Sequence, residues 1–149
     1  MISPLQKITV FLRIVFTITL LVVFHDAITM AASEEGIKVT LSGDQEVPAV
    51  STSASATGTV IVSSDKSVTT AISVSGIEPT AAHIHEGARG QNGPVIIPLT
   101  KTSDNTWSVR EGAKLTDAQY KSYLAGNLYI NVHSAAHKGG EIRAQLNPK

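Results

Sequence analysis

Hydrophobic and polar residues alternate with a period of two along most of the chain. In residues 68–74 this alternation places Val68, Thr70, Ile72 and Val74 on one face of an expected strand. Clusters of Gly, Pro, Ser, Asp and Asn separate the segments of this kind, as turns separate strands. The expected strands cover residues 37–41, 56–63, 68–74, 81–85, 95–99, 105–109, 128–133 and 142–146.

Between residues 109 and 128 the alternation of hydrophobic and polar residues is interrupted, and the sequence predicts one short helix near residues 116–125. Thr116 and Gln119 form a capping-box pattern, and Gly126 is suited to end the helix. About eight strands with a single helix predict an all-β fold, an antiparallel Greek-key sandwich or barrel. Within it, the apolar segment 95–99 is expected to be buried on both faces. The apolar stripe expected on the helix consists of Leu115, Tyr120, Tyr123 and Leu124.

The start of the chain predicts a secretory signal peptide over residues 1–31. Two basic residues precede a run of eleven residues, 14–24, in which only two threonines are polar. At about 1.5 Å per residue, a helix of this run spans about 17 Å, short of the roughly 30 Å hydrocarbon core of a bilayer. Residues 32–149 are then a secreted, periplasmic or cell-surface domain with no stable membrane anchor. The alternative is a membrane helix lengthened by residues 8–10.

The composition narrows the classes of function. Lys and Arg together number 12, and so do Asp and Glu, so the net charge is zero. Binding to the phosphate backbone of a nucleic acid needs a clear excess of cations, so no nucleic-acid partner is expected. The chain has no cysteine, which excludes disulfides, thiolate metal sites and a thiol nucleophile. An exported domain of this kind depends on its core, its hydrogen bonds or a metal for stability.

His83 and His85 form the sharpest chemical feature, because residues two apart on a strand project from the same face. His133 lies on one face with Asn131 in a second alternating segment, and His137 follows in a loop rich in glycine. The predicted mature domain has no other histidine. Imidazoles without thiolates suit copper(II), zinc or nickel, so these four histidines are predicted to bind a metal ion of this class. The alternative is that they only complete hydrogen bonds to water or backbone.

Three charged residues near these segments are weaker candidates. Glu86 could be a carboxylate ligand or the partner of one, and Arg89 and Arg143 could attract an anion. For all three, an exposed or salt-bridged side chain is the commoner role. No serine has an adjacent His–acid arrangement that would indicate a nucleophile.

Motifs at several places in the chain combine into one pattern. They are L-S-G-D-Q-E-V-P at 41–48, A-H-I-H-E-G at 82–87, N-G-P-V at 92–95, L-A-G-N-L-Y-I-N-V-H at 124–133 and G-E-I-R-A-Q-L at 140–146. This combination resembles the CHRD domain, a module first named from chordin, over nearly all of residues 37–148. The resemblance implies an extracellular domain of unsettled biochemical role, and a copy that stands alone resembles the microbial members.

A second similarity links residues 58–87 to the Cu/Zn superoxide dismutase sandwich, in which a strand–turn–strand leads to a His-x-His pair that binds copper. His83-Ile84-His85 stands at that place, and Asn131-Val132-His133 is similar to a later strand that supplies another copper ligand. The resemblance implies a copper-type site, with Arg143 as a residue that guides anions. The chain departs from that family because it lacks cysteine and a recognisable zinc loop, and because His137 has no counterpart.

Three hypotheses about function follow. The first is an exported CHRD-domain protein that binds a metal ion, copper above zinc, through the four histidines. The second is a redox enzyme similar to superoxide dismutase. The third is an extracellular structural or interaction module that binds a partner protein and no metal.

Overall fold

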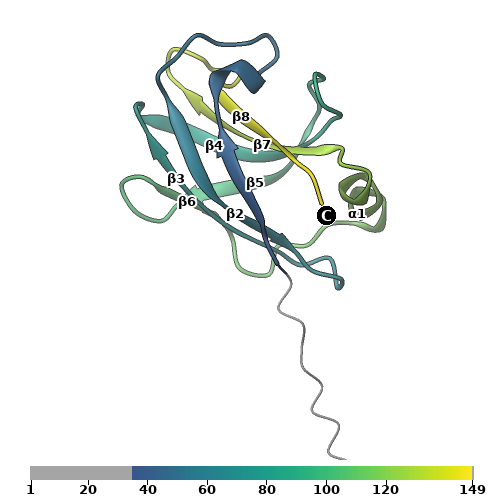
Figure 1. Ribbon diagram of the computed structural model, residues 1–149. Helices are drawn as coiled ribbons and strands as arrows, with labels where there is room; N and C mark the ends of the chain where they lie inside the picture. Colours follow the sequence, from purple (N-terminus) through teal and green to yellow (C-terminus); the bar gives the residue numbers. More distant parts are fainter. Residues whose placement is uncertain (1–34, 149) are drawn as a thin grey trace, which may run out of the picture. The chain divides into compact units, whose positions relative to one another are not determined.

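The computed structural model describes residues 35–148. The predicted signal peptide, residues 1–31, and the alternative membrane helix lie outside the described residues. The described part contains eight strands, one α-helix and a short 3-10 helix, η1 (Gly43–Gln45) (Figure 1). The other elements are β1 (Ile37–Leu41), β2 (Ser55–Val62), β3 (Val68–Ser75), β4 (Pro79–Glu86), β5 (Val95–Lys101), β6 (Thr106–Val109), α1 (Asp117–Leu124), β7 (Leu128–Ser134) and β8 (Ile142–Leu146).

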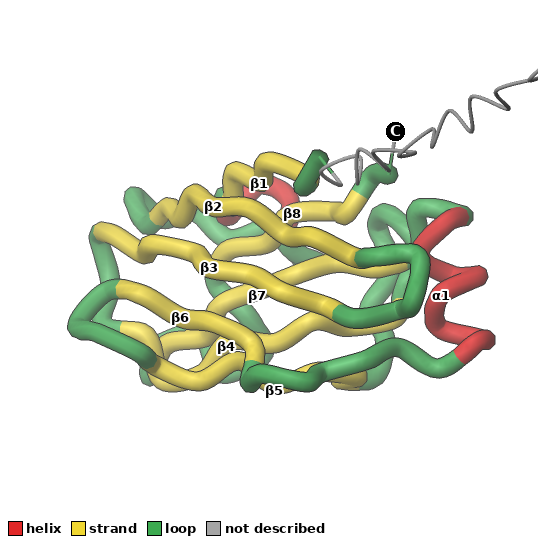
Figure 2. The backbone as a smooth tube through the Cα atoms, turned by 90° about the horizontal axis from the view of Figure 1, so that it is seen from below, coloured by secondary structure: helices red, strands yellow, loops and turns green. Residues whose placement is uncertain are grey.

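The eight strands form one antiparallel sheet in the order β1-β2-β3-β6-β5-β4-β7-β8. β3 and β4 are consecutive in the chain but are separated in the sheet by β6 and β5, which is a Greek-key connection. The sheet curls until its edges meet at Ser42 and Arg143, which exchange backbone hydrogen bonds of 3.2 and 3.1 Å. Figure 2 shows β2, β3 and β6 in a layer that faces β8, β7 and β4. The predicted all-β Greek-key sandwich or barrel with one short helix is confirmed.

The interior is built from the alternation seen in the sequence. In β3, Val68, Thr70, Ile72 and Val74 are all buried, as predicted. The strands of the opposite layer also turn their apolar residues inward, which leaves their polar residues on the outer face. The inward residues of β4, β7 and β8 are Ala82, Ile84, Leu128, Ile130, Val132, Ile142, Ala144 and Leu146.

β5 departs from the prediction that residues 95–99 are buried on both faces. Ile97 and Leu99 are buried, whereas Val95 is 48% exposed and Pro98 is exposed. The interior of a curled sheet takes only every second residue of a strand, and within residues 35–148 no second layer covers the outer face of β5. A compact apolar sequence is therefore not enough to predict two covered faces.

α1 begins as the sequence predicts. The hydroxyl of Thr116 accepts a hydrogen bond from the N–H of Gln119, and the Gln119 side chain accepts one from the N–H of Thr116. These two bonds satisfy backbone donors that the first turn leaves unpaired. Gly126 follows the helix with a φ of 72°, a conformation that favours glycine.

Replacing Thr116 with alanine is expected to lower the free energy of unfolding by about 1 kcal/mol, because the N–H of Gln119 loses its acceptor. Thr116→Ser keeps the hydroxyl and should retain most of the stability. Urea denaturation of the three proteins measures the difference. Equal losses in the alanine and serine variants would show that the hydroxyl does not cap the helix.

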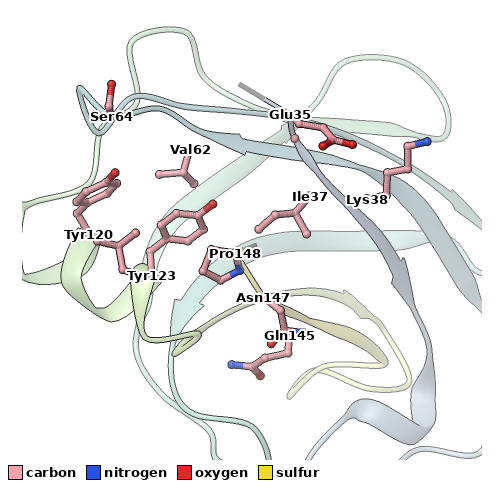
Figure 3. Close-up of a pocket in the computed structure, with 12 residues that line it drawn as sticks. Glu35, Ile37, Lys38, Val62, Ser64, Tyr120, Tyr123, Gln145, Asn147 and Pro148 are labelled. Carbon is pink, nitrogen blue, oxygen red and sulfur yellow. The ribbon is translucent and has the colours of Figure 1, made fainter. Parts of the chain in front are cut away.

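The apolar stripe predicted on the helix is only partly correct. Leu115 and Tyr123 are buried and Tyr120 is half-buried, but Leu124 is exposed. Tyr120, Tyr123 and Leu124 line a pocket of about 760 Å³ between α1, the start of β1 and the end of the described chain (Figure 3). No histidine of the described residues lines this pocket, so the predicted chemistry lies elsewhere.

Candidate metal centre

Three of the four predicted histidines converge on the outer face of β4 and β7. Antiparallel pairing sets His83 opposite Asn131, and His85 opposite Tyr129. Since side chains two apart share a face, His133 projects from the same surface as these four residues. One ring nitrogen each from His83, His85 and His133 lies within 4.8 Å of the others.

His133 presents a lone pair to this group. Its Nδ1 is 2.9 Å from the carbonyl oxygen of Lys138, which can only accept, so Nδ1 carries the proton. In the neutral ring Nε2 is then an acceptor, and it lies 3.0 Å from Nδ1 of His83. The backbone carbonyl thus fixes the tautomer and the orientation of the ring, as outer-shell partners do for ligand histidines.

His85 presents a second lone pair and is the most buried of the three histidines, with 7% of its surface exposed. Its Nδ1 donates to the carbonyl oxygen of Gly93 at 2.9 Å. Its Nε2 is buried and makes no hydrogen bond within ordinary geometric limits. A buried acceptor without a partner costs free energy, so this atom calls for an explanation.

A stack of three side chains holds the ring of His85 in place. The ring of Tyr129 lies parallel to that of His85, with 4.7 Å between the ring centres and 6° between the planes. The guanidinium carbon of Arg143 is 3.4 Å from the centre of the Tyr129 ring. Stacking and cation–π attraction therefore restrict the rotation of both rings.

Arg143 is 1% exposed, and its guanidinium is hydrogen-bonded to the loop that follows β4. Its Nη1 donates to the carbonyl oxygen of Gln91 at 3.0 Å, and its Nη2 donates to that of Ala88 at 3.2 Å. Gln145 also donates to this loop, at the carbonyl oxygen of Gly87. The guanidinium therefore positions the loop that carries the acceptor of His85. The predicted guidance of anions by Arg143 stays untested.

The remaining predicted residues lie outside the group of three. The backbone N–H of His137 donates to Ser134 Oγ, in the turn after β7, and its ring is not among the convergent ligand atoms. The carboxylate of Glu86 accepts from the hydroxyl of Ser122 in α1, which draws it away from the histidines. Arg89 is exposed. The geometry does not support His137 as a ligand.

Three residues at the site were not among the functional residues predicted from the sequence: Glu46, Tyr129 and Asn131. The alternation of β7 placed Asn131 beside His133, and the same period extended by two residues would have included Tyr129. Glu46 comes from the segment after η1, which covers the outer face of the sheet, and no local pattern indicated its burial. Burial raises the pKa of the Glu46 carboxyl, although hydrogen bonds from Val47 and Asn131 partly oppose the shift.

Burial also lowers the pKa of His83 and of His85, because a charged imidazole loses hydration there, and the neighbouring His133 lowers both further. The hydrogen bond to Gly93 and the nearby side chain of Asn131 raise the pKa of His85 without reversing the shift. Both rings are therefore neutral at neutral pH, which is the form that binds metals.

The metal-free protein is expected to lose stability as the pH falls below 6.5, the ordinary pKa of histidine. The folded pKa values lie below the unfolded ones, so the unfolded chain binds more protons in the window between them, and acid favours unfolding. Urea denaturation at several pH values measures how steeply the free energy of unfolding changes with pH. The variant His83→Gln/His85→Gln should show a smaller change. An equal change in the two proteins would contradict the attribution of the acid sensitivity to His83 and His85.

Over residues 37–146 the chain matches the family described as the CHRD domain. The chain belongs to the CHRD domain family. No curated protein and no solved structure matches it, so the similarity to Cu/Zn superoxide dismutase stays a prediction. The matched range of this CHRD domain contains all three convergent histidines.

Within residues 35–148, no helix has the length and hydrophobicity that crossing a membrane requires.

Proposed function

We propose that this CHRD domain binds one divalent transition-metal ion, copper(II) above zinc, through His83, His85 and His133. The observation that carries the proposal is the convergence of three ring nitrogens within 4.8 Å on one face of a sheet. Among the ring nitrogens of these histidines, Nε2 of His85 is buried and has no hydrogen-bond partner. A cation bonded to this atom would remove the cost of burying it unpaired.

The spacing of the nitrogens supports the proposal. Ligand nitrogens about 2.0–2.1 Å from one ion lie about 2.9–3.4 Å apart, for angles between square-planar and tetrahedral. Nδ1 of His83 and Nε2 of His133 are 3.0 Å apart. In the metal-free protein this contact is a hydrogen bond donated by His83. An ion would take the place of that proton, and Nε2 of His83 would carry it instead.

The donor set selects the class of metal. Calcium and magnesium prefer oxygen ligands, whereas imidazole suits copper, zinc and nickel. Among these ions, copper(II) binds nitrogen sites most tightly, which places it first. The bound ion would supply a fixed positive charge and Lewis acidity on the outer face of the sheet. The role of the chain is to orient the three rings through Gly93, Lys138 and the stack on Tyr129.

We also propose that the domain acts outside the cell. CHRD domains are generally extracellular, and residues 1–31 have the sequence features of a signal peptide. Mass spectrometry of the protein collected outside the cytoplasm tests this point. The expected chain begins within a few residues of position 32, and recovery of only the uncleaved chain would contradict it.

Superoxide dismutation is not part of the proposal. The guanidinium of Arg143 is buried and donates to carbonyl oxygens of the protein, so it supplies no argument for a path that attracts anions. No other observation on the described residues favours that reaction over simple binding.

Titration of the metal-free protein with copper(II) and with zinc(II) tests the proposed function. We expect one ion per chain and a rise in the melting temperature. At a free ion concentration of about 100 times Kd, the stabilisation should be about 2.7 kcal/mol. The variant His83→Ala/His133→Ala should lose both effects, and His137→Ala, the matched control, should keep them. Binding that survives in the double variant, or no binding by the wild type, would overturn the proposal.

A further inference from the structure

The side-chain oxygen of Asn131 faces the same space as the histidine lone pairs. Oδ1 of Asn131 is 3.1 Å from Nε2 of His133. Because Nδ1 of His133 donates to Lys138, Nε2 of the neutral ring has a lone pair and no proton. Two lone pairs at hydrogen-bonding distance repel one another unless a proton or a cation lies between them.

The orientation of the Asn131 amide is set from its other end. Nδ2 of Asn131 lies 3.4 Å from Oε1 of Glu46, and only the nitrogen end of an amide can donate to a carboxylate. Both side chains are buried, so water does not compete for this contact. Gly140 packs against the pair, and a Cβ at that position would overlap both side chains. Oδ1 is thereby held toward the histidines.

The other groups that could complete the site are engaged elsewhere. His137 is not among the convergent ligand atoms. Glu141 accepts a hydrogen bond of 2.6 Å from the hydroxyl of Thr52, and Glu46 faces the nitrogen end of Asn131. Among these neighbours, Asn131 is the one whose oxygen lies at ligand-to-ligand distance from a histidine nitrogen of the group.

We propose that Oδ1 of Asn131 is the fourth protein ligand of the metal ion, an inference that rests on the metal binding proposed above. The ion would replace the repulsion between two lone pairs with two bonds. Neutral carbonyl oxygens serve as weak, long-bonded ligands in some copper sites. Asn131 therefore contributes to the geometry of the site, while the three imidazoles supply most of the affinity.

Electron–nuclear double resonance of the copper(II)-loaded full chain tests this ligand directly. Asparagine labelled with carbon-13 at the side-chain carbonyl should give a resolved coupling to copper in the wild type. The coupling should disappear in Asn131→Leu, whose copper affinity should fall about tenfold, in the range that partners of metal sites contribute. It should persist in the control Asn105→Ser, because Asn105 is exposed in the turn before β6.

The outcomes separate this inference from the proposed function. Copper uptake without a carbon-13 coupling, or with a coupling to oxygen-17 of labelled water in its place, would exclude Asn131 as the fourth ligand. It would not affect the proposal that the three histidines bind the ion. Failure of the wild type to take up copper overturns both. The decisive spectrum is that of the wild type, so the result does not depend on the folding of Asn131→Leu.

Discussion

Replacing His85 with alanine is expected to lower the copper(II) affinity by at least about 100-fold, since even outer-shell partners of metal sites are worth about 10–100-fold. His85 supplies the lone pair that is buried and has no partner in the metal-free protein. Its ring is also held by Tyr129 and Gly93, so no other side chain of this stack can take its place. Competition against a chelator of known affinity measures the change.

Two controls make this result specific. Urea denaturation of metal-free His85→Ala shows whether the fold survives, and His137→Ala reports the effect of losing a histidine outside the group. A folded His85→Ala protein that binds copper(II) as tightly as the wild type would exclude His85 as a ligand. A loss of equal size in His137→Ala would mean that the ion binds elsewhere.

Gly93→Ala is expected to cost about 3 kcal/mol or more of unfolding free energy, at the upper end of overpacking effects. A Cβ at Gly93 would lie 1.6 Å from the carbonyl oxygen of Glu86, which belongs to the backbone and cannot rotate away. The loop would have to move, and with it the carbonyl oxygen of Gly93 that accepts from His85. Copper(II) affinity should therefore fall together with stability.

Gly139→Ala is the matched control for this prediction, because a Cβ at Gly139 would meet nothing within 4 Å. Urea denaturation and copper titration of the two variants give both quantities. If Gly93→Ala unfolds like the wild type, the close approach of the loop to β4 is not a feature of the folded protein. If stability falls and copper affinity does not, the carbonyl of Gly93 does not orient His85.

The parts of the fold that depend on local periodicity could be predicted from the sequence. The alternation in residues 68–74 gave the buried face of β3, and Thr116 with Gln119 gave the start of α1. Burial on the outer side of the sheet could not be predicted, because it depends on which segments cross it. Val95 is therefore exposed, while Arg143 is covered by a loop more than fifty residues earlier in the chain.

The residues of the candidate site also fall into those that local periodicity could predict and those that it could not. The period of two in each strand placed His83 with His85, and Asn131 with His133, before the pairing of β4 with β7 was known. Glu46 lies 85 residues from Asn131, and no local signal marks its approach. His137 lies in a turn, where the alternation of a strand does not apply, so the sequence could not indicate whether its ring joins the other three histidines.

Anomalous X-ray diffraction from crystals of the copper-loaded protein, measured at the copper absorption edge, would show where the ion binds. We expect one strong peak at bonding distance from Nδ1 of His83, Nε2 of His85 and Nε2 of His133. A peak at His137 or at another surface, with none among these three nitrogens, would contradict it.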